Sequence, residues 1–145
     1  MWSEPAVHRY ILGRPPTAEE HWNRLLRFGG MWQWFGRGLW AATDRQTGAL
    51  LGQVGFGEFR RQIVSPLWTE PGPPEAAWVF SGAAHGRGLA AEAVGACLGW
   101  LGARPVRAII NPDNTASQRL AARMGFACVG EAPYRDETTL LFHRA

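Results

Sequence analysis

Lysine is absent from this chain of 145 residues, and all 15 of its basic side chains are arginines. A lysine Schiff base and the lysine-dependent phosphate site of P-loop proteins are therefore both excluded. The formal net charge is only +3, and the arginines are scattered along the sequence. Nucleic-acid binding is not indicated, because it requires a dense basic patch or stripe. The modest positive charge is compatible with a small anionic ligand.

Cysteine is scarce, and the histidines are not spaced as metal ligands. The two cysteines, Cys97 and Cys128, lie in apolar segments, which predicts buried free thiols rather than a disulfide or a metal pair. Neither a zinc site nor a Cys-His nucleophile is supported, so we expect no metal.

Long apolar runs are also missing. No segment approaches the roughly 18 apolar residues that a membrane span needs, and the N-terminus has no signal or transit pattern. We therefore expect a cytoplasmic protein without a membrane partner. The hydrophobic content of 46% and the chain length fit one globular domain over residues 1–145.

Hydrophobic periodicity and turn residues predict alternating strands and helices. A capping box at Thr17-Ala18-Glu19-Glu20 indicates a helix over 17–28. The other expected elements are a strand-like run at 7–12, a hairpin of strands 38–43 and 49–56, a strand at 75–81, a helix at 88–101, a strand at 106–111, a helix at 115–124 behind a second capping box at 115–118, and strands at 126–130 and 138–143.

Two segments between these elements have more than one interpretation. The aromatic run at 31–35 fits packing in the core or at its rim, and it also fits a platform for a ligand. The proline-rich loop at 60–74 fits the wall of a substrate pocket or a passive surface crossing, since long loops in compact domains are often functional.

A glycine-rich turn from His85 to Ala91 leads out of the strand at 75–81 into the helix at 88–101. Gly86 and Gly88 let the main chain approach a ligand closely, and the helix behind them begins with free amides and a positive dipole end. The turn therefore fits an anion site, although an ordinary strand-to-helix loop has the same pattern. A nucleotide fingerprint is disfavoured, because its Gly-Lys-Ser/Thr or distant acidic residue is missing.

With these elements in this order, the chain resembles the GNAT superfamily of acetyl-CoA-dependent N-acetyltransferases, closest to the branch related to ribosomal-protein N-terminal acetyltransferases. The family signature Gln/Arg-x-x-Gly-x-Gly/Ala is matched, except at its first position, by His85-Gly86-Arg87-Gly88-Leu89-Ala90. The second signature, Asn-x-x-Ser with a helix and Gly-Phe, is matched by Asn114, Ser117, Gly125 and Phe126. Two residues of the preceding strand also match this branch, Glu75 and Trp78.

The resemblance implies an α+β fold with a central, mostly antiparallel twisted sheet flanked by helices. Family chains usually begin with a further strand before the first helix, and we expect this sequence to start after it. An open sheet edge invites pairing, so we expect the 7–12 segment or a second subunit of a homodimer to cover that edge.

The resemblance also implies acetyl-CoA as the co-substrate. Its pyrophosphate is expected on the amides of residues 86–91, and its pantetheine arm on the main chain where the strand at 75–81 leaves its neighbour. The expected coenzyme-binding residues are Val79, Phe80, His85, Gly86, Arg87, Gly88, Leu89, Ala90, Ala91, Asn114 and Ser117.

For proton transfer the first candidate is Glu75, near the start of the central strand, although a solvated glutamate at a strand end fits as well. Glu58 is a weaker candidate. The tyrosine that many family members use as an acid is replaced by Ala121. Ser117 is expected to stabilise the thiolate, or else only to cap a helix, and Tyr134 in the last loop lies within possible reach.

The expected function is transfer of an acetyl group from acetyl-CoA to a primary amine of a small molecule or a protein N-terminus, by direct attack in a ternary complex. The alternative is a catalytically inactive coenzyme-A-binding sensor or subunit, which the absent tyrosine and strand motivate. Protein N-termini, amino acids, polyamines and antibiotics all remain open as acceptors. Tryptophans near the expected pocket favour an apolar or flat one.

Overall fold

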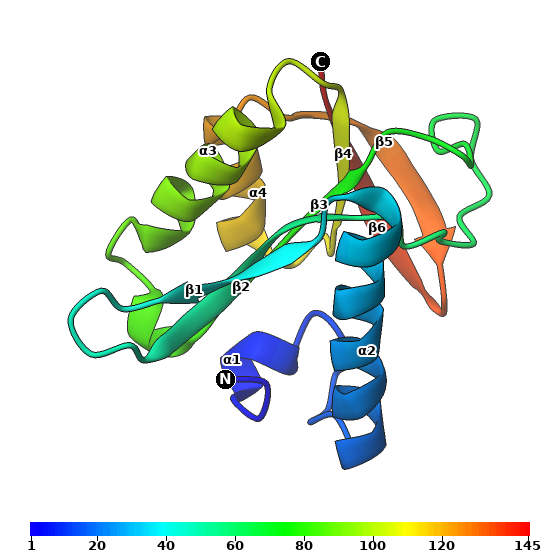
Figure 1. Ribbon diagram of the computed structural model, residues 1–145. Helices are drawn as coiled ribbons and strands as arrows, with labels where there is room; N and C mark the ends of the chain where they lie inside the picture. The colour runs from blue at the N-terminus through cyan, green and yellow to red at the C-terminus, as the bar shows by residue number, and fades with distance from the viewer.

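A single sheet carries the fold in the computed structural model, which describes residues 1–145 (Figure 1). Its strand order is β1-β2-β3-β4-β6-β5, and every neighbouring pair is antiparallel except β3 with β4. The strands are β1 Leu39–Thr43, β2 Leu50–Gly57, β3 Glu75–Phe80, β4 Val106–Ile110, β5 Ala127–Tyr134 and β6 Glu137–Arg144. The expected mostly antiparallel sheet is confirmed.

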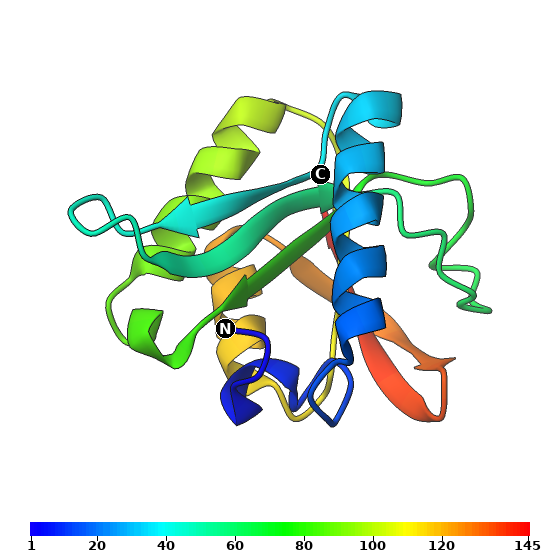
Figure 2. The same cartoon turned by 60° about the horizontal axis from the view of Figure 1, so that its bottom comes forward.

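Helices lie on both faces of this sheet. They are α1 Pro5–His8, α2 Ala18–Phe35, α3 Leu89–Leu101 and α4 Thr115–Arg123, and a short 3-10 turn covers Gly82–Ala84. Figure 2 shows α2 crossing the front of the sheet while α3 and α4 lie behind it. None of these helices combines the length and hydrophobicity that crossing a membrane requires.

The main core lies between the sheet and the α3/α4 layer. Phe56 of β2 and Val106 of β4 are each 1% exposed and pack toward Val94 and Leu98 of α3 in one cluster. Burial of such side chains stabilises the fold by about 1.5 to 3 kcal/mol each. The α2 layer contributes far less, because Met31 is its only buried residue. This uneven packing leaves room for cavities on the α2 side.

Strands β3 and β4 meet at one residue pair only, Glu75 with Arg107. Beyond that pair the two strands diverge, whereas β3 stays paired with β2 along its whole length. The β4-facing main-chain groups of residues 76–80 therefore have no strand partner. This is the part of the sheet where the pantetheine arm is expected.

Helix α2 is longer than the predicted 17–28. Its N-terminus has the predicted capping box, in which Thr17 and Glu20 each accept a hydrogen bond from the other's amide. The helix then continues through Gly29 and the aromatic run and ends at Gly36, which has a left-handed φ of 61°. Trp32 explains the extension, because its indole donates to the Leu39 carbonyl.

The prediction of a strand-like run at 7–12 is wrong. Residues 5–8 form helix α1, which Pro5 favours because a proline at the first helical positions needs no amide partner. The segment pairs with no sheet edge, so it does not cover one. Instead, its Glu4 carboxylate accepts a hydrogen bond from the Gly82 amide at 2.9 Å, which holds the N-terminal segment near the end of β3.

Three local predictions also need correction. Cys97 is buried, as expected, but Cys128 is exposed on β5. Tyr134 is the last residue of β5 and does not lie in a loop, because this strand runs beyond the predicted 126–130. Helix α4 is capped by Asn114, whose side chain accepts from the Ser117 amide at 3.1 Å, so Thr115 is not its cap.

Candidate functional site

The glycine turn has the geometry of an anion site. Gly86 and Gly88 have left-handed φ angles of 70° and 74°, which residues with a Cβ rarely adopt. Gly88 is the N-cap of α3 and supplies no side-chain hydrogen bond, so the first amides of this 13-residue helix keep no capping partner. These amides and the positive end of the helix dipole favour a phosphate.

A cavity of about 560 Å³ adjoins this turn, and we call it the glycine-turn pocket. Its walls are the end of β3, the turn itself, the start of α4 and residues of the N-terminal segment. It brings together the predicted coenzyme residues Val79, Phe80, His85, Gly86, Gly88, Ala90, Ala91, Asn114 and Ser117, whereas Arg87 and Leu89 do not line it.

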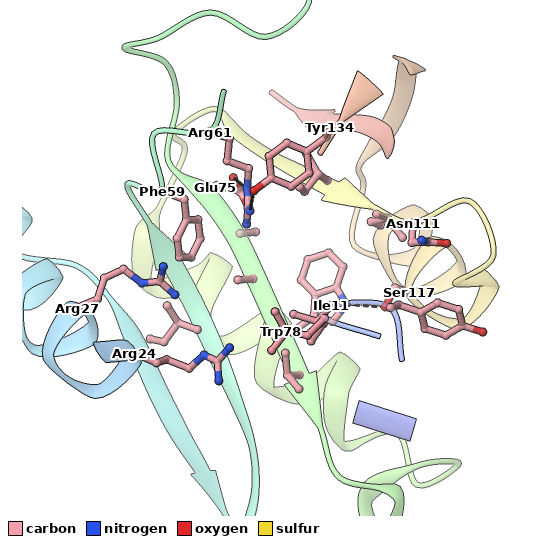
Figure 3. Close-up of a pocket in the computed structure, with 18 of the residues that line it drawn as sticks. Ile11, Arg24, Arg27, Phe59, Arg61, Glu75, Trp78, Asn111, Ser117 and Tyr134 are labelled. Atoms are coloured by element: carbon pink, nitrogen blue, oxygen red, sulfur yellow. Dashed lines mark hydrogen bonds and ion pairs between the residues drawn. The ribbon is translucent and has the colours of Figure 1, made fainter. Parts of the chain in front are cut away.

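Three polar side chains of this pocket have defined partners. The Trp78 indole donates to the Ser117 hydroxyl at 3.2 Å, which leaves the hydroxyl proton of Ser117 free to be donated (Figure 3). The Asn114 side-chain oxygen caps α4, so its NH₂ group remains available to a ligand. His85 Nε2 lies 3.3 Å from the Phe80 carbonyl oxygen, so this ring nitrogen already has a partner inside the protein.

A second cavity, of about 840 Å³, lies against β3 on the side of α2. Trp78, Val79, Asn114 and Ser117 line both cavities, so the two meet at the second half of β3. We call the second cavity the arginine pocket, because five arginines from α2, from the segment after β2 and from the β5–β6 turn line it: Arg24, Arg27, Arg60, Arg61 and Arg135.

Glu75 lies in the wall of the arginine pocket and is only 3% exposed. Both of its carboxylate oxygens accept hydrogen bonds from Arg61, at 2.5 to 2.8 Å. Arg61 in turn donates to the Tyr134 hydroxyl at 2.9 Å. Figure 3 shows these three side chains together at one end of the pocket. The interpretation of Glu75 as a solvated strand-end residue is therefore wrong.

Burial and charge act in opposite directions on this pair. Burial raises the pKa of the Glu75 carboxyl above its ordinary value, and the charge of Arg61 opposes the rise. Burial alone would lower the pKa of the Arg61 guanidinium, but Glu75 outweighs it and raises that pKa. Arg61 is thus a fixed cation, and it orients the carboxylate.

The other predicted candidates lie outside this cluster. Glu58 forms a salt bridge with Arg37, and its side chain does not line either pocket. Ala121 is the buried residue of α4 and belongs to the main core. Burial raises the pKa of the Cys97 thiol to about 11, which makes it a poor nucleophile. No group of three or more His, Cys, Asp or Glu side chains is placed to hold a metal ion.

Comparisons with known proteins agree with this architecture. The sequence profile of the family described as "Acetyltransferase (GNAT) domain" matches residues 1–127. The chain is 32% identical over 133 residues to the protein YkkB of Bacillus subtilis, spanning 86% of this chain and 70% of YkkB. The chain therefore belongs to the GNAT family and is an acetyltransferase.

Solved structures of the same family superpose on the chain. A GNAT-family acetyltransferase structure from Bordetella pertussis has a TM-score of 0.82 at 36% identity, over 93% of this chain and 81% of that protein. A phosphinothricin acetyltransferase from Sinorhizobium meliloti, solved with acetyl-CoA, has a TM-score of 0.66 at 24% identity, over 90% of this chain and 70% of that protein. At that identity the second likeness shows the fold alone.

Sequence reasoning missed the arginines and the N-terminal segment. Arg61, which holds Glu75, lies in a loop of a chain with 15 arginines, so nothing in its surroundings distinguishes it. Tyr10 and Ile11 line both pockets although they were expected in a strand. A helical spacing of three between Arg24 and Arg27 was the one available signal, since such residues share a helix face.

Proposed function

We propose that this chain transfers the acetyl group of acetyl-CoA to a primary amine by direct attack in a ternary complex. The observation that carries the proposal is the position of the glycine turn. Its uncapped helix start adjoins the same part of β3 that has lost its partner strand, and the two pockets meet there. Donor and acceptor can thus enter from different sides and meet at Trp78 and Val79.

The residues present fit acetyl-CoA. The amides of residues 86–91 suit its pyrophosphate, because two left-handed glycines leave them open and no side chain caps them. Main-chain groups of Phe80 suit its pantetheine arm, since they face away from β2 without a strand partner, whereas the amide and carbonyl of Val79 face β2. The free NH₂ group of Asn114 adds a donor on the opposite wall.

The reaction forms a bond between the amine nitrogen and the acetyl carbon and breaks the bond between that carbon and sulfur. The amine loses one proton, and the leaving thiolate gains one. We propose Glu75 as the proton acceptor, directly or through water. Its carboxylate has about four lone-pair sites, and Arg61 occupies three of them. We propose that the Ser117 hydroxyl stabilises the thiolate, because its proton is free.

An acceptor screen with thiol detection of released coenzyme A tests the proposed function. Amines of every class should be offered, and at least one should raise release above the acetyl-CoA background. Coenzyme A binding without release for any acceptor would contradict acetyl transfer and favour the inactive sensor instead.

The Glu75→Gln variant tests the proton acceptor separately. Loss of a general base lowers turnover by about 10² to 10⁴-fold. Coenzyme A binding, measured by calorimetry on the same sample, should stay unchanged because the glycine turn is intact. Full turnover in this variant would remove Glu75 from the mechanism.

The homodimer and the cytoplasmic location both stay predictions. The surface best suited to a homodimer contact is on α2, where Trp22, Leu25 and Leu26 are 59%, 61% and 55% exposed. Exposed apolar patches of this kind often mark interfaces. Light scattering at micromolar concentration measures the mass directly, and a monomer would contradict the dimer.

A further inference from the structure

The arginine pocket carries an excess of positive charge that the chain does not neutralise. Two glutamates line the pocket, but both already have partners, since Glu20 pairs with Arg14 and Glu75 pairs with Arg61. The remaining lining arginines form no salt bridge within the chain: Arg24, Arg27, Arg60 and Arg135. Such an uncompensated group of cations favours an anionic ligand.

Arg24 is the arginine of this group with a buried hydrogen-bond donor that lacks a partner. Its guanidinium stacks on the Trp2 ring at 3.7 Å, and its Nη1 atom is buried without any hydrogen-bond partner. Desolvation lowers the pKa of this guanidinium, and Arg27 lowers it further. A buried donor without an acceptor costs free energy, which an oxygen atom of a ligand would recover.

Arg27 lies one helical turn further along α2, on the same face. Its guanidinium lies 5.7 Å from the centre of the Phe59 ring, and Arg61 lies 4.9 Å from the same ring. Desolvation lowers the pKa of Arg27, and the charge of Arg61 lowers it further. Stacking on a ring leaves the N–H edge of a guanidinium free, and that edge matches the two oxygens of a carboxylate. Figure 3 shows Arg24 and Arg27 directed into the cavity from α2, facing β3.

The backbone conformation of two lining arginines also marks the arginine pocket as a ligand site. Arg60 and Arg135 are the only two non-glycine residues in the chain with a positive φ, at 49° and 57°. The left-handed conformation is unfavourable for a residue with a Cβ. Both strained residues line the arginine pocket, and strain of this kind gathers at ligand sites.

We propose that the acceptor is a small amine that carries a carboxylate, as amino acids do, and that Arg24 and Arg27 bind this carboxylate. The inference rests on the proposed function and narrows its acceptor. Polyamines and polycationic antibiotics are disfavoured, because a positively charged chain of amines is repelled by four unpaired arginines. The carboxylate lies on the α2 side of the pocket, and the amine lies toward Trp78 and Val79.

Matched acceptors test the proposal. Each standard amino acid is compared with its own carboxamide, which keeps the amine and removes the negative charge. Because amidation also lowers the pKa of the α-amine, kcat/KM is calculated from the concentration of unprotonated amine for both compounds. At least one acid should exceed its amide in kcat/KM by about tenfold or more, as expected for a charged hydrogen-bond pair. Equal values for every acid and its amide would overturn the proposal while leaving acetyl transfer intact.

Variants locate the contact. Arg24→Gln and Arg27→Gln should each raise the KM of the preferred acid by about tenfold, with little change in its kcat or in transfer to the amide. Arg45→Gln is the matched control, because Arg45 lies in the β1–β2 turn and lines neither pocket. A loss that is equal for acid and amide would show a structural role and overturn the assignment of these two arginines.

A binding measurement separates this inference from catalysis. The N-acetyl derivatives of the amino acids and of their amides are titrated calorimetrically into the chain with coenzyme A present. An N-acetyl acid should bind at least about tenfold more tightly than its amide, and Arg24→Gln should remove the difference. Equal binding of acid and amide throughout, including no binding of either, overturns the proposal whether or not the chain is active.

Discussion

The two pockets that meet at β3 differ in the chemical groups that define them. The glycine-turn pocket is centred on one short turn, whose helix-start amides have a chemistry that does not depend on side-chain identity. The arginine pocket is formed by side chains from α2, from the loop after β2, from β3 and from the end of β5. Acetyl-CoA, the proposed acetyl donor, suits a site made of main-chain groups. The amine acceptor suits a site made of side chains, which can differ from one protein to another.

The substitution with the largest expected effect disrupts the arginine pocket and leaves the glycine-turn pocket intact. Glu75→Ala removes one partner of a buried ion pair and leaves Arg61 without its carboxylate. We expect the free energy of unfolding to fall by about 3 to 5 kcal/mol, measured by urea denaturation. The double variant Glu75→Leu with Arg61→Met should recover most of this loss. A stable Glu75→Ala protein would mean that the pair contributes little to the fold.

The next effect concerns Ser117, which belongs to both pockets. Ser117→Ala removes the acceptor of the Trp78 indole and the proposed partner of the thiolate. If the hydroxyl acts in catalysis, kcat should fall by about 10²-fold with coenzyme A affinity unchanged. Thr115→Ala is the control, because its hydroxyl is exposed on the same first helical turn. An equal, small change in both variants would restrict Ser117 to a structural role.

A smaller effect tests whether the glycine-turn pocket depends on backbone conformation. Gly88→Val should let the turn relax out of its left-handed φ of 74°, and restoring that φ costs about 1 to 2 kcal/mol. Coenzyme A should therefore bind about 5 to 30-fold more weakly, as measured by calorimetry. Gly48→Val is the matched control, since Gly48 has a similar φ of 72°, open surroundings and a place outside both pockets. Weakening by both variants would point to general destabilisation.

The smallest effect concerns the start of α2, which supports only the arginine pocket. A hydrogen bond from Arg14, followed by one from the Thr17 amide, lowers the pKa of Glu20 to about 2. Its stabilising contribution is therefore complete above the ordinary value of 4.5 and is lost as the pH falls toward 2. The Tm of Glu20→Gln should lie slightly below that of the natural chain at pH 7, and the gap should close in acid. Glu19→Gln, one residue earlier, is the control, because Glu19 forms no salt bridge and its substitution should lower the Tm at pH 7 less.

The difference between the pockets also decided what could be predicted from the sequence. The glycine turn, α3, α4 and the positions of most strands along the chain followed from glycine spacing, capping residues and periodicity, because these patterns are local. Phe28 was the expected end of α2, yet the helix continues to Phe35, where Trp32 packs edge-on against Trp40 with ring centroids 4.7 Å apart. That contact depends on tertiary structure.

The arginine pocket could not be predicted for the same reason. Glu75 and Arg61 are separated by 14 residues, and Arg61 and Tyr134 by 73, so only the folded chain brings them together. Glu75 was a candidate from the sequence, and it lines the pocket, but its partner Arg61 was not anticipated. In a chain whose cations are all arginine, residue type carries no information about which cation lies in a site.

The unpaired arginines also act before any ligand is bound. A group of like charges around one cavity attracts anions from solution over about one Debye length, roughly 8 Å at physiological ionic strength. The rate at which an anionic acceptor meets the chain should therefore depend on salt more steeply than the rate for a neutral amine. These side chains would set how fast the acceptor arrives as well as how tightly it is held.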